Sequence, residues 1–301
     1  MKTMSITAAT LMLLTGAAGH GQATVASGQA YPAVNGETIH CPVNTPPSAE
    51  QQAMQFDTAP RDLAALSEMA RSFTDPNSEA AAQWRAVQAE RNATDWPFLC
   101  RYRDANAELK RSGQRPQVVF MGDSITEGWI VADGEFFSSN GYVDRGISGQ
   151  SSPQMVARFY HDVIALNPRV VHIMTGTNDI GGATGPITED EYIGYVRAMI
   201  DMARANGIEV VLAAMPPMTM LLPRPDFDVK PWVRSMNARL KQTATEYGIT
   251  FVDYYTPLAD EAGAFDTAYA NDGVHPTRAG YAVMEPLARR AIDAALAKSV
   301  P

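Results

Sequence analysis

The fold is decided by a stretch of sequence, VVFMGDSIT, that runs from Val118 to Thr126. Its first part, Val118–Met121, is a short apolar run that ends at Gly122, a pattern typical of a strand buried on both faces of a sheet. Ser124 follows at once. We therefore expect a tight turn that presents the hydroxyl of Ser124 at the edge of the sheet.

The same alternation continues to the end of the chain. Further strand-like runs lie at Tyr142–Ile147, Val170–Thr175, Glu209–Ala214 and Thr250–Tyr254. Helical patterns lie between and after them, at Pro153–Leu166, Glu189–Asn206, Pro231–Tyr247 and Thr277–Lys298. Strands that alternate with helices predict an α/β domain over residues 116–301, with a parallel sheet covered on both faces.

The N-terminal part of the chain has a different character. Residues 1–23 resemble a secretory signal peptide, with Lys2 before the apolar stretch Thr7–Leu14 and a small residue, Ala23, at the expected cleavage point. An amphipathic tail is the alternative. Residues 24–115 are expected to form a mostly helical extension that begins with a loose lead-in over 24–47, which is rich in Gly, Pro, Thr and Asn. Two helical patterns follow the lead-in, at Ser48–Phe73 and Ser78–Asn92.

The chain contains two cysteines, Cys41 and Cys100. Export would place them in an oxidising compartment, so we hypothesise a disulfide between them, with two free thiols as the alternative. No CxxC motif or Cys/His cluster suggests a metal, and no motif suggests a cofactor.

The charge balance limits the possible partners. A net charge of -9 argues against nucleic acid and against anionic membrane surfaces. Beyond the N-terminal stretch, no run reaches the ~18 apolar residues of a membrane span, so stable membrane insertion is not expected.

Two more motifs follow predicted strands, GISGQS (Gly146–Ser151) and GTND (Gly176–Asp179). The backbone N–H of Gly149 and the side-chain amide of Asn178 can each donate a hydrogen bond to a developing negative charge, as can the N–H of Ser124. Taken singly, each motif also fits an ordinary turn or helix cap. The carboxyl ends of parallel strands share one edge of a sheet, so we expect these donors to meet there.

A fourth motif, DGVHP (Asp272–Pro276), lies in the loop before the last helix. Asp272 and His275 are three positions apart, which allows the carboxylate to bind one ring nitrogen while the other faces Ser124. A surface loop with a lone histidine is the alternative. His172 falls within a strand pattern and is expected to be structural.

The four motifs together resemble the GDSL, or SGNH, hydrolase superfamily. Its serine, glycine, asparagine and histidine match Ser124, Gly149, Asn178 and His275, and its acid matches Asp272. The resemblance covers about residues 116–296. It implies a flavodoxin-like three-layer α/β/α sandwich with a five-stranded parallel sheet, and hydrolysis of esters or thioesters, usually without metal. The GDSITEGW stretch is similar to bacterial relatives of platelet-activating-factor acetylhydrolase and to carbohydrate acetylesterases.

The substrate is less constrained by the sequence. The apolar loop Pro216–Pro223, with Met218 and Met220, is a candidate wall of an acyl pocket, and Trp129 a candidate aromatic contact; core packing is the alternative for both. We expect a periplasmic or secreted serine esterase that removes acetyl groups from a carbohydrate. A general short-chain carboxylesterase or lysophospholipase, an O-acetyltransferase and a catalytically silent glycan-binding module are the alternatives.

Overall fold

The structure, a computed structural model, describes residues 27–42, 48–56, 93–221 and 224–298, together with isolated positions between 64 and 89. The centre of the molecule is a five-stranded sheet in the order β4-β3-β5-β6-β7, and every neighbouring pair is parallel. The strands are β3 (Val118–Gly122), β4 (Tyr142–Gly146), β5 (Val170–Ile173), β6 (Glu209–Ala213) and β7 (Thr250–Val252). The predicted α/β fold with a five-stranded parallel sheet is confirmed.

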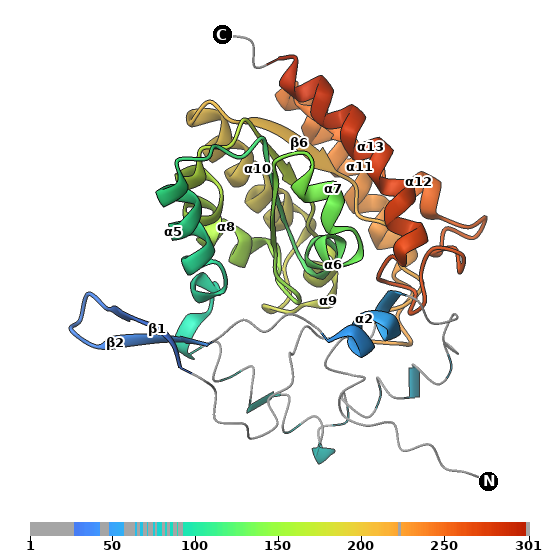
Figure 1. The fold of residues 1–301 in the computed structure, drawn as a ribbon. Helices are drawn as coiled ribbons and strands as arrows, with labels where there is room; N and C mark the ends of the chain where they lie inside the picture. The colour runs from blue at the N-terminus through green and yellow to red at the C-terminus, as the bar shows by residue number, and fades with distance from the viewer. Residues whose placement is uncertain are drawn as a thin grey trace.

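Helices cover both faces of the sheet (Figure 1). One face packs on α8 (Ser152–Asp162), α10 (Glu189–Ala205) and α11 (Lys230–Tyr247). The other face packs on α6 (Ser124–Ala132), α7 (Gly134–Ser138) and α13 (Arg278–Leu296). Three short helices complete this part of the chain: η2 (Ile164–Leu166), α9 (Thr177–Gly181) and α12 (Tyr255–Leu258).

The central strand β3 shows why the sheet needs both layers. Val119 and Met121 belong to one core cluster, whereas Val118 and Phe120 belong to the other, and all four side chains are fully buried. Side chains alternate between the faces of a strand, so an unbroken apolar run fills two cores at once.

The strand order also fixes where a ligand site can form. β3 has β4 on one side and β5 on the other, so the chain reverses its direction of travel across the sheet at this strand. Loops that leave neighbouring strands in opposite directions open a crevice at their carboxyl ends. Ser124, Gly149 and Asn178 all lie in segments that follow these three strands.

The N-terminal extension differs from the prediction. Residues 27–42 form an antiparallel hairpin of β1 (Ser27–Pro32) and β2 (Thr38–Pro42), where we expected a loose lead-in. The described helices of the extension are α2 (Ala49–Phe56), the short η1 (Leu99–Arg101) and α5 (Arg103–Ser112). The predicted signal peptide, and most of the predicted helices between 57 and 92, lie outside the described residues.

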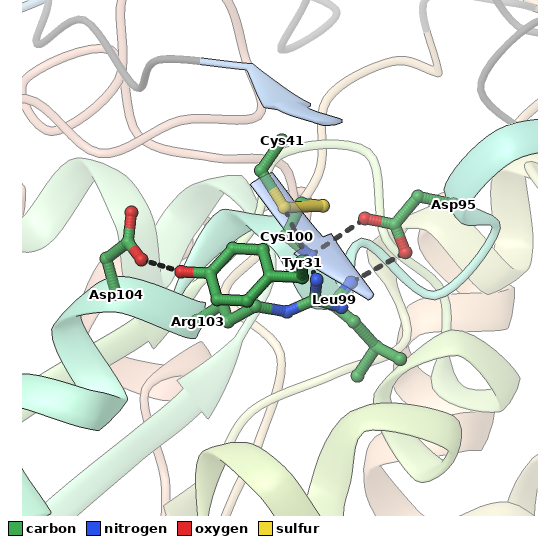
Figure 2. Close-up of a disulfide and its surroundings, with 7 residues drawn as sticks. All are labelled: Tyr31, Cys41, Asp95, Leu99, Cys100, Arg103 and Asp104. Carbon is green, nitrogen blue, oxygen red and sulfur yellow. Dashed lines mark hydrogen bonds between the residues drawn. A yellow bond between two sulfur atoms is a disulfide. The ribbon is translucent and has the colours of Figure 1, made fainter. Parts of the chain in front are cut away.

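A disulfide joins β2 to η1 (Figure 2). It connects Cys41 and Cys100, the pair proposed from the sequence, whose Cα atoms are 5.2 Å apart. Asp95 caps the turn beside it, because its carboxylate accepts hydrogen bonds from the N–H groups of Leu99 (2.9 Å) and Cys100 (2.8 Å). The hairpin is further held by Tyr31, which donates to Asp104 and lies beneath the guanidinium of Arg103 at 4.5 Å. Long-range contacts of this kind explain a hairpin in a stretch whose composition favours loops.

Within the part of the chain that the structure covers, no helix has the length and apolar character needed to cross a membrane.

We predict that the protein without residues 1–23 contains no titratable thiol when denatured, because both of its cysteines are paired. Replacing both cysteines by serine should lower the free energy of unfolding by about 4 kcal/mol, the chain-entropy value for a closed loop of about 60 residues. Thiol titration and urea unfolding of the wild type and the double variant measure these effects. Two titratable thiols in the non-reduced protein would contradict the bond.

Candidate active site

Ser124 is the first residue of α6 and follows β3 directly after a tight turn. The cap of the helix is Asp123, whose buried carboxylate accepts a hydrogen bond from the N–H of Ile125 at 2.9 Å. Capping by Asp123 leaves the hydroxyl of Ser124 free for another partner. Ser124 is half-buried while Asp123 and Ile125 on either side are buried, so the hydroxyl lies at the surface of the site.

That partner is His275. Its Nε2 lies 2.9 Å from the Ser124 Oγ, and its Nδ1 lies 2.8 Å from Oδ2 of Asp272. The other oxygen of Asp272 accepts the N–H groups of Val274 (2.9 Å) and His275 (2.8 Å). Burial acts to raise the pKa of Asp272, but the charge of His275 and these hydrogen bonds outweigh it, so the pKa lies below its usual value. The carboxylate stays ionised and holds the imidazole with its Nε2 toward the serine.

The loop with Asp272 and His275 is supported by the apolar loop after β6. The N–H of Thr219 donates to the carbonyl of Gly273 at 2.8 Å, and the Thr219 hydroxyl accepts from the N–H of Phe265 at 3.2 Å. Met218 is buried in the core cluster that contains α10 and α11, and its place in the wall of an acyl pocket stays a prediction. Met220 is also buried, with 6% of its surface exposed. In the structure, this loop braces the histidine loop.

Trp129 shows the core packing that was the alternative to an aromatic contact with substrate, and such a contact stays a prediction. Its side chain is fully buried in an aromatic cluster, stacked between Phe136 (ring centroids 5.2 Å apart) and Tyr281 (5.5 Å). The apolar side of α6 has to cover the sheet, and Trp129 lies on that side.

His172 is a core residue as expected: it stacks on Phe120 and bonds the Tyr254 hydroxyl, and burial lowers its pKa to about 3.

Gly149 and Asn178 lie in adjacent loops. The side-chain N–H of Asn178 donates to the carbonyl of Gln150, the residue after Gly149, at 3.0 Å. An asparagine amide carries two N–H donors, so this bond orients the group and leaves the second donor for another acceptor. Both residues are half-buried. They follow β4 and β5, the two neighbours of the strand that leads to Ser124.

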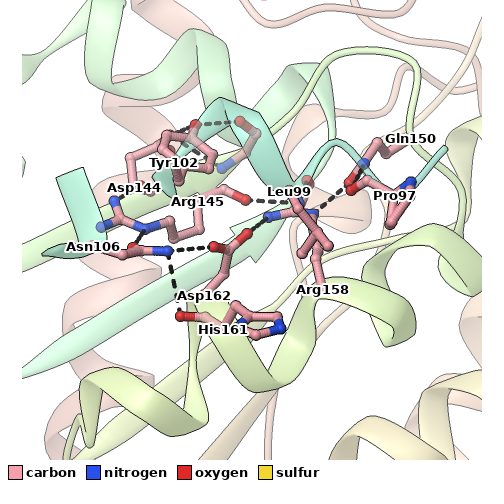
Figure 3. A network of polar contacts seen from close by, with 12 residues as sticks. Pro97, Leu99, Tyr102, Asn106, Asp144, Arg145, Gln150, Arg158, His161 and Asp162 are labelled. Atoms are coloured by element: carbon pink, nitrogen blue, oxygen red, sulfur yellow. Dashed lines mark hydrogen bonds and ion pairs between the residues drawn. The ribbon is translucent and has the colours of Figure 1, made fainter. Parts of the chain in front are cut away.

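A buried arginine fixes the loop that holds Gly149 (Figure 3). Arg158 of α8 is fully buried; its Nε donates to the side chain of Gln150 at 2.5 Å and its Nη1 to Asp162 at 2.9 Å. Its Nη2 donates to the carbonyls of Gly122 (3.1 Å) and Arg145 (2.8 Å), where β3 and β4 end. One guanidinium therefore joins the turn before Ser124 to the loop around Gly149.

The Asp of the GTND motif has a role that the sequence did not indicate. Asp179 accepts hydrogen bonds from the N–H of Ser152 (3.0 Å) and from its hydroxyl, so it caps α8 across the site. Burial raises the pKa of Asp179 to about 6, against these hydrogen bonds. Glu127 and Arg158 could not be recognised from the sequence, because a single charged residue in a helical pattern is typical of a solvated helix face.

Among the described residues, no group of three or more His, Cys, Asp or Glu side chains could hold a metal ion.

The chain belongs to the GDSL-like Lipase/Acylhydrolase family, whose sequence profile matches residues 120–283. The fold resembles the crystal structures of a GDSL-like lipase from Bacteroides thetaiotaomicron (41% identity, TM-score 0.64, 67% of this chain and 100% of that chain) and of a proposed acylhydrolase from Bacteroides fragilis (44%, 0.63, 67% and 99%). The sequence is 27% identical to an acetylxylan esterase of Geobacillus stearothermophilus, with 57% of this chain and 91% of the relative covered. The family and this relative identify the protein as an ester hydrolase.

Asp144, in the middle of β4, is a buried carboxylate with one unpartnered oxygen. Its Oδ1 accepts from the Tyr102 hydroxyl and the Gly146 N–H, both at 3.1 Å, whereas no partner is found for Oδ2. Burial raises the pKa of Asp144 to about 7, against the hydrogen bond from Gly146. The pKa of this group in the unfolded chain is about 3.9. At pH values between these two pKa values, the carboxyl of Asp144 holds its proton in the folded state but loses it in the unfolded state. Stability from this group is therefore fully present at acid pH and is lost as the pH rises toward 7.

We predict that Asp144→Asn flattens the pH dependence of stability between pH 5 and 7. In the wild type, this carboxyl lowers the free energy of unfolding by up to about 1.4 kcal/mol for each unit by which the pH rises. The neutral amide of asparagine has no such effect. Urea unfolding of both proteins at pH 5, 6, 7 and 8 measures the difference. Parallel curves for the two proteins would contradict the raised pKa.

Proposed function

We propose that this protein is an exported serine esterase that removes O-acetyl groups from a carbohydrate, with Ser124, His275 and Asp272 as its catalytic triad. The observation that carries the proposal is the continuous hydrogen-bonded chain from the Ser124 hydroxyl through both ring nitrogens of His275 to the buried Asp272. This arrangement has the geometry that nucleophile activation by a general base requires.

The reaction follows from that geometry. His275 takes the proton of Ser124 as its oxygen attacks the ester carbonyl, and Asp272 stabilises the imidazolium that forms. The oxyanion accepts hydrogen bonds from the N–H groups of Ser124 and Gly149 and from the free N–H of Asn178. The imidazolium then protonates the leaving alcohol. Water hydrolyses the acyl-enzyme by the same route, with His275 again as the base.

Two observations support the choice of substrate. The sequence relative from Geobacillus stearothermophilus is an acetylxylan esterase, an enzyme named for an acetylated glycan. The apolar loop after β6 packs into the core and against the loop that carries Asp272 and His275. Met218 is therefore buried and exposed neither to solvent nor to a long acyl chain. Both favour a short acyl group. The general carboxylesterase and the O-acetyltransferase remain the alternatives that the experiments must separate.

Export is proposed from two features of the extension. Residues 1–23 have the charged start, apolar stretch and small residue of a signal peptide. The bond between Cys41 and Cys100 belongs to an oxidising compartment. The periplasm and the extracellular space both meet this condition.

We predict that Asn178→Ala lowers kcat roughly 100- to 1,000-fold, the usual effect of removing one side-chain donor from an oxyanion hole. KM should change little, because the donor binds charge that develops only in the transition state. Steady-state kinetics with p-nitrophenyl acetate measure both constants. Asn206→Ala, which removes a surface asparagine that bonds the Met202 carbonyl, is the control. A kcat equal to that of the control would exclude Asn178 from the reaction.

The proposed function is tested by hydrolysis of p-nitrophenyl esters from acetate to laurate, with the wild type beside Ser124→Ala. We expect turnover of acetate that falls steeply with chain length and is lost in the variant. Activity should also decline on the acid side, as a histidine with a reference pKa of ~6.5 becomes protonated. Release of acetate from acetylated xylo-oligosaccharides, compared with transfer of acetyl groups to added sugars, separates hydrolase from transferase. Full activity in Ser124→Ala would refute the mechanism.

A further inference from the structure

We infer that Glu127 is a positioning residue for the oxyanion donor Gly149, and that Arg101 of the N-terminal extension holds Glu127 in place. The inference deepens the proposed function and rests on it. It assigns to the extension, which lies outside residues 120–283 matched by the family, a part in catalysis.

The carboxylate of Glu127 bridges two segments of the site. Its Oε2 accepts hydrogen bonds from the backbone N–H of Ser148 at 2.8 Å and from the Ser148 hydroxyl at 2.5 Å. Ser148 is the residue before Gly149. Glu127 lies three residues after Ser124 on α6, about one helical turn. One side chain thus fixes the donor loop to the helix that starts with the nucleophile.

The segment Gly146–Ser151, which carries the donor Gly149, runs very close to α6, and its position depends on this contact. A Cβ atom at Gly146 would lie 2.1 Å from the backbone nitrogen of Glu127, so only glycine permits the approach. Gly149 has a φ of +80°, a left-handed conformation that sets the direction of its N–H. A donor in such a turn points at the oxyanion only while the residues on both sides are held.

Both sides are held, and part of the support comes from the extension. Gln150, on the far side of Gly149, is bound by Arg158 and also donates to the carbonyl of Pro97 at 3.1 Å. On the near side, Arg101 donates from Nη2 to the Oε1 of Glu127 at 2.7 Å. Arg101 directly follows Cys100, so the disulfide and the cap at Asp95 fix its backbone.

The charge of Arg101 has a second effect. A carboxylate beside an oxyanion hole disfavours the negative charge that forms there, and a guanidinium at ion-pair distance offsets it. The side chains of Arg101 and Glu127 are 31% and 24% exposed, so the pair adds little to stability as such. Its expected contribution is to the geometry and charge of the site.

The test is Glu127→Gln. The amide has a single oxygen acceptor, which cannot serve Ser148 and Arg101 together as the two carboxylate oxygens do. We expect kcat for p-nitrophenyl acetate to fall roughly 10- to 100-fold, less than for loss of a donor, because the Gly149 N–H is displaced and not removed. KM and the acid limb of the pH–rate profile should stay as in the wild type, since His275 is untouched.

The matched control is Glu246→Gln, which removes the carboxylate of a surface pair with Arg197, also at 2.7 Å. Arg101→Gln is the second variant: it keeps the carboxylate of Glu127 and removes only its cationic partner, and it should lower kcat as well. Combining Arg101→Gln with Glu127→Gln should cost no more than Glu127→Gln alone, because both act on Gly149 by the same path.

The outcomes separate the inference from the function on which it rests. If Ser124→Ala is inactive while Glu127→Gln and Arg101→Gln match the control, the inference is overturned and the proposed function stands. A fall in activity that only follows the folded fraction, measured by circular dichroism at the assay temperature, also overturns it. If Ser124→Ala keeps the wild-type activity, both are overturned.

Discussion

The arrangement of the site depends on the buried guanidinium of Arg158. Transferring a charge into the interior costs several kcal/mol unless a counter-ion and hydrogen bonds compensate it, and here Asp162, Gln150 and two strand-end carbonyls do so. The Asp162 carboxylate is in turn bound by Asn106 of α5 at 2.6 Å. Since Gly122 lies on β3, Arg145 on β4 and Gln150 in the loop after β4, the charge of Arg158 on α8 is satisfied only when these three segments are in place. The cost of burial thus selects a single arrangement of the loops.

That arrangement explains how the candidate active site forms from loops that lie far apart in the sequence. The parallel sheet brings the ends of β3, β4 and β5 to one edge, and polar contacts behind the reacting groups define their directions: Asp123 caps α6, Asp179 caps α8 and Asn178 bonds Gln150. Asp123 and Asp179 are the sequence neighbours of Ser124 and Asn178, and Asn178 itself uses only one of its two N–H donors. The reactive atoms stay free because their neighbours satisfy the local hydrogen-bonding needs.

Much of this could be predicted from the sequence. Apolar runs located the five strands to within two residues at their ends, because strands buried on both faces leave an unmistakable local pattern. The spacing of the DGVHP motif predicted that Asp272 and His275 act together on Ser124, and the three side chains are hydrogen-bonded in the structure. The β1–β2 hairpin and the contacts of Glu127 could not be predicted in this way. Each depends on contacts distant in the sequence, such as Tyr31 with Arg103, which local composition does not encode.

The bond between Cys41 and Cys100 has a topological consequence. It closes a covalent ring that includes every residue between the two cysteines, 59 positions apart. A protease that cuts the chain once inside this ring opens it without dividing the molecule. The hairpin would stay tethered to η1 through the disulfide. Such a nicked protein migrates as one species until the disulfide is reduced, and then as two.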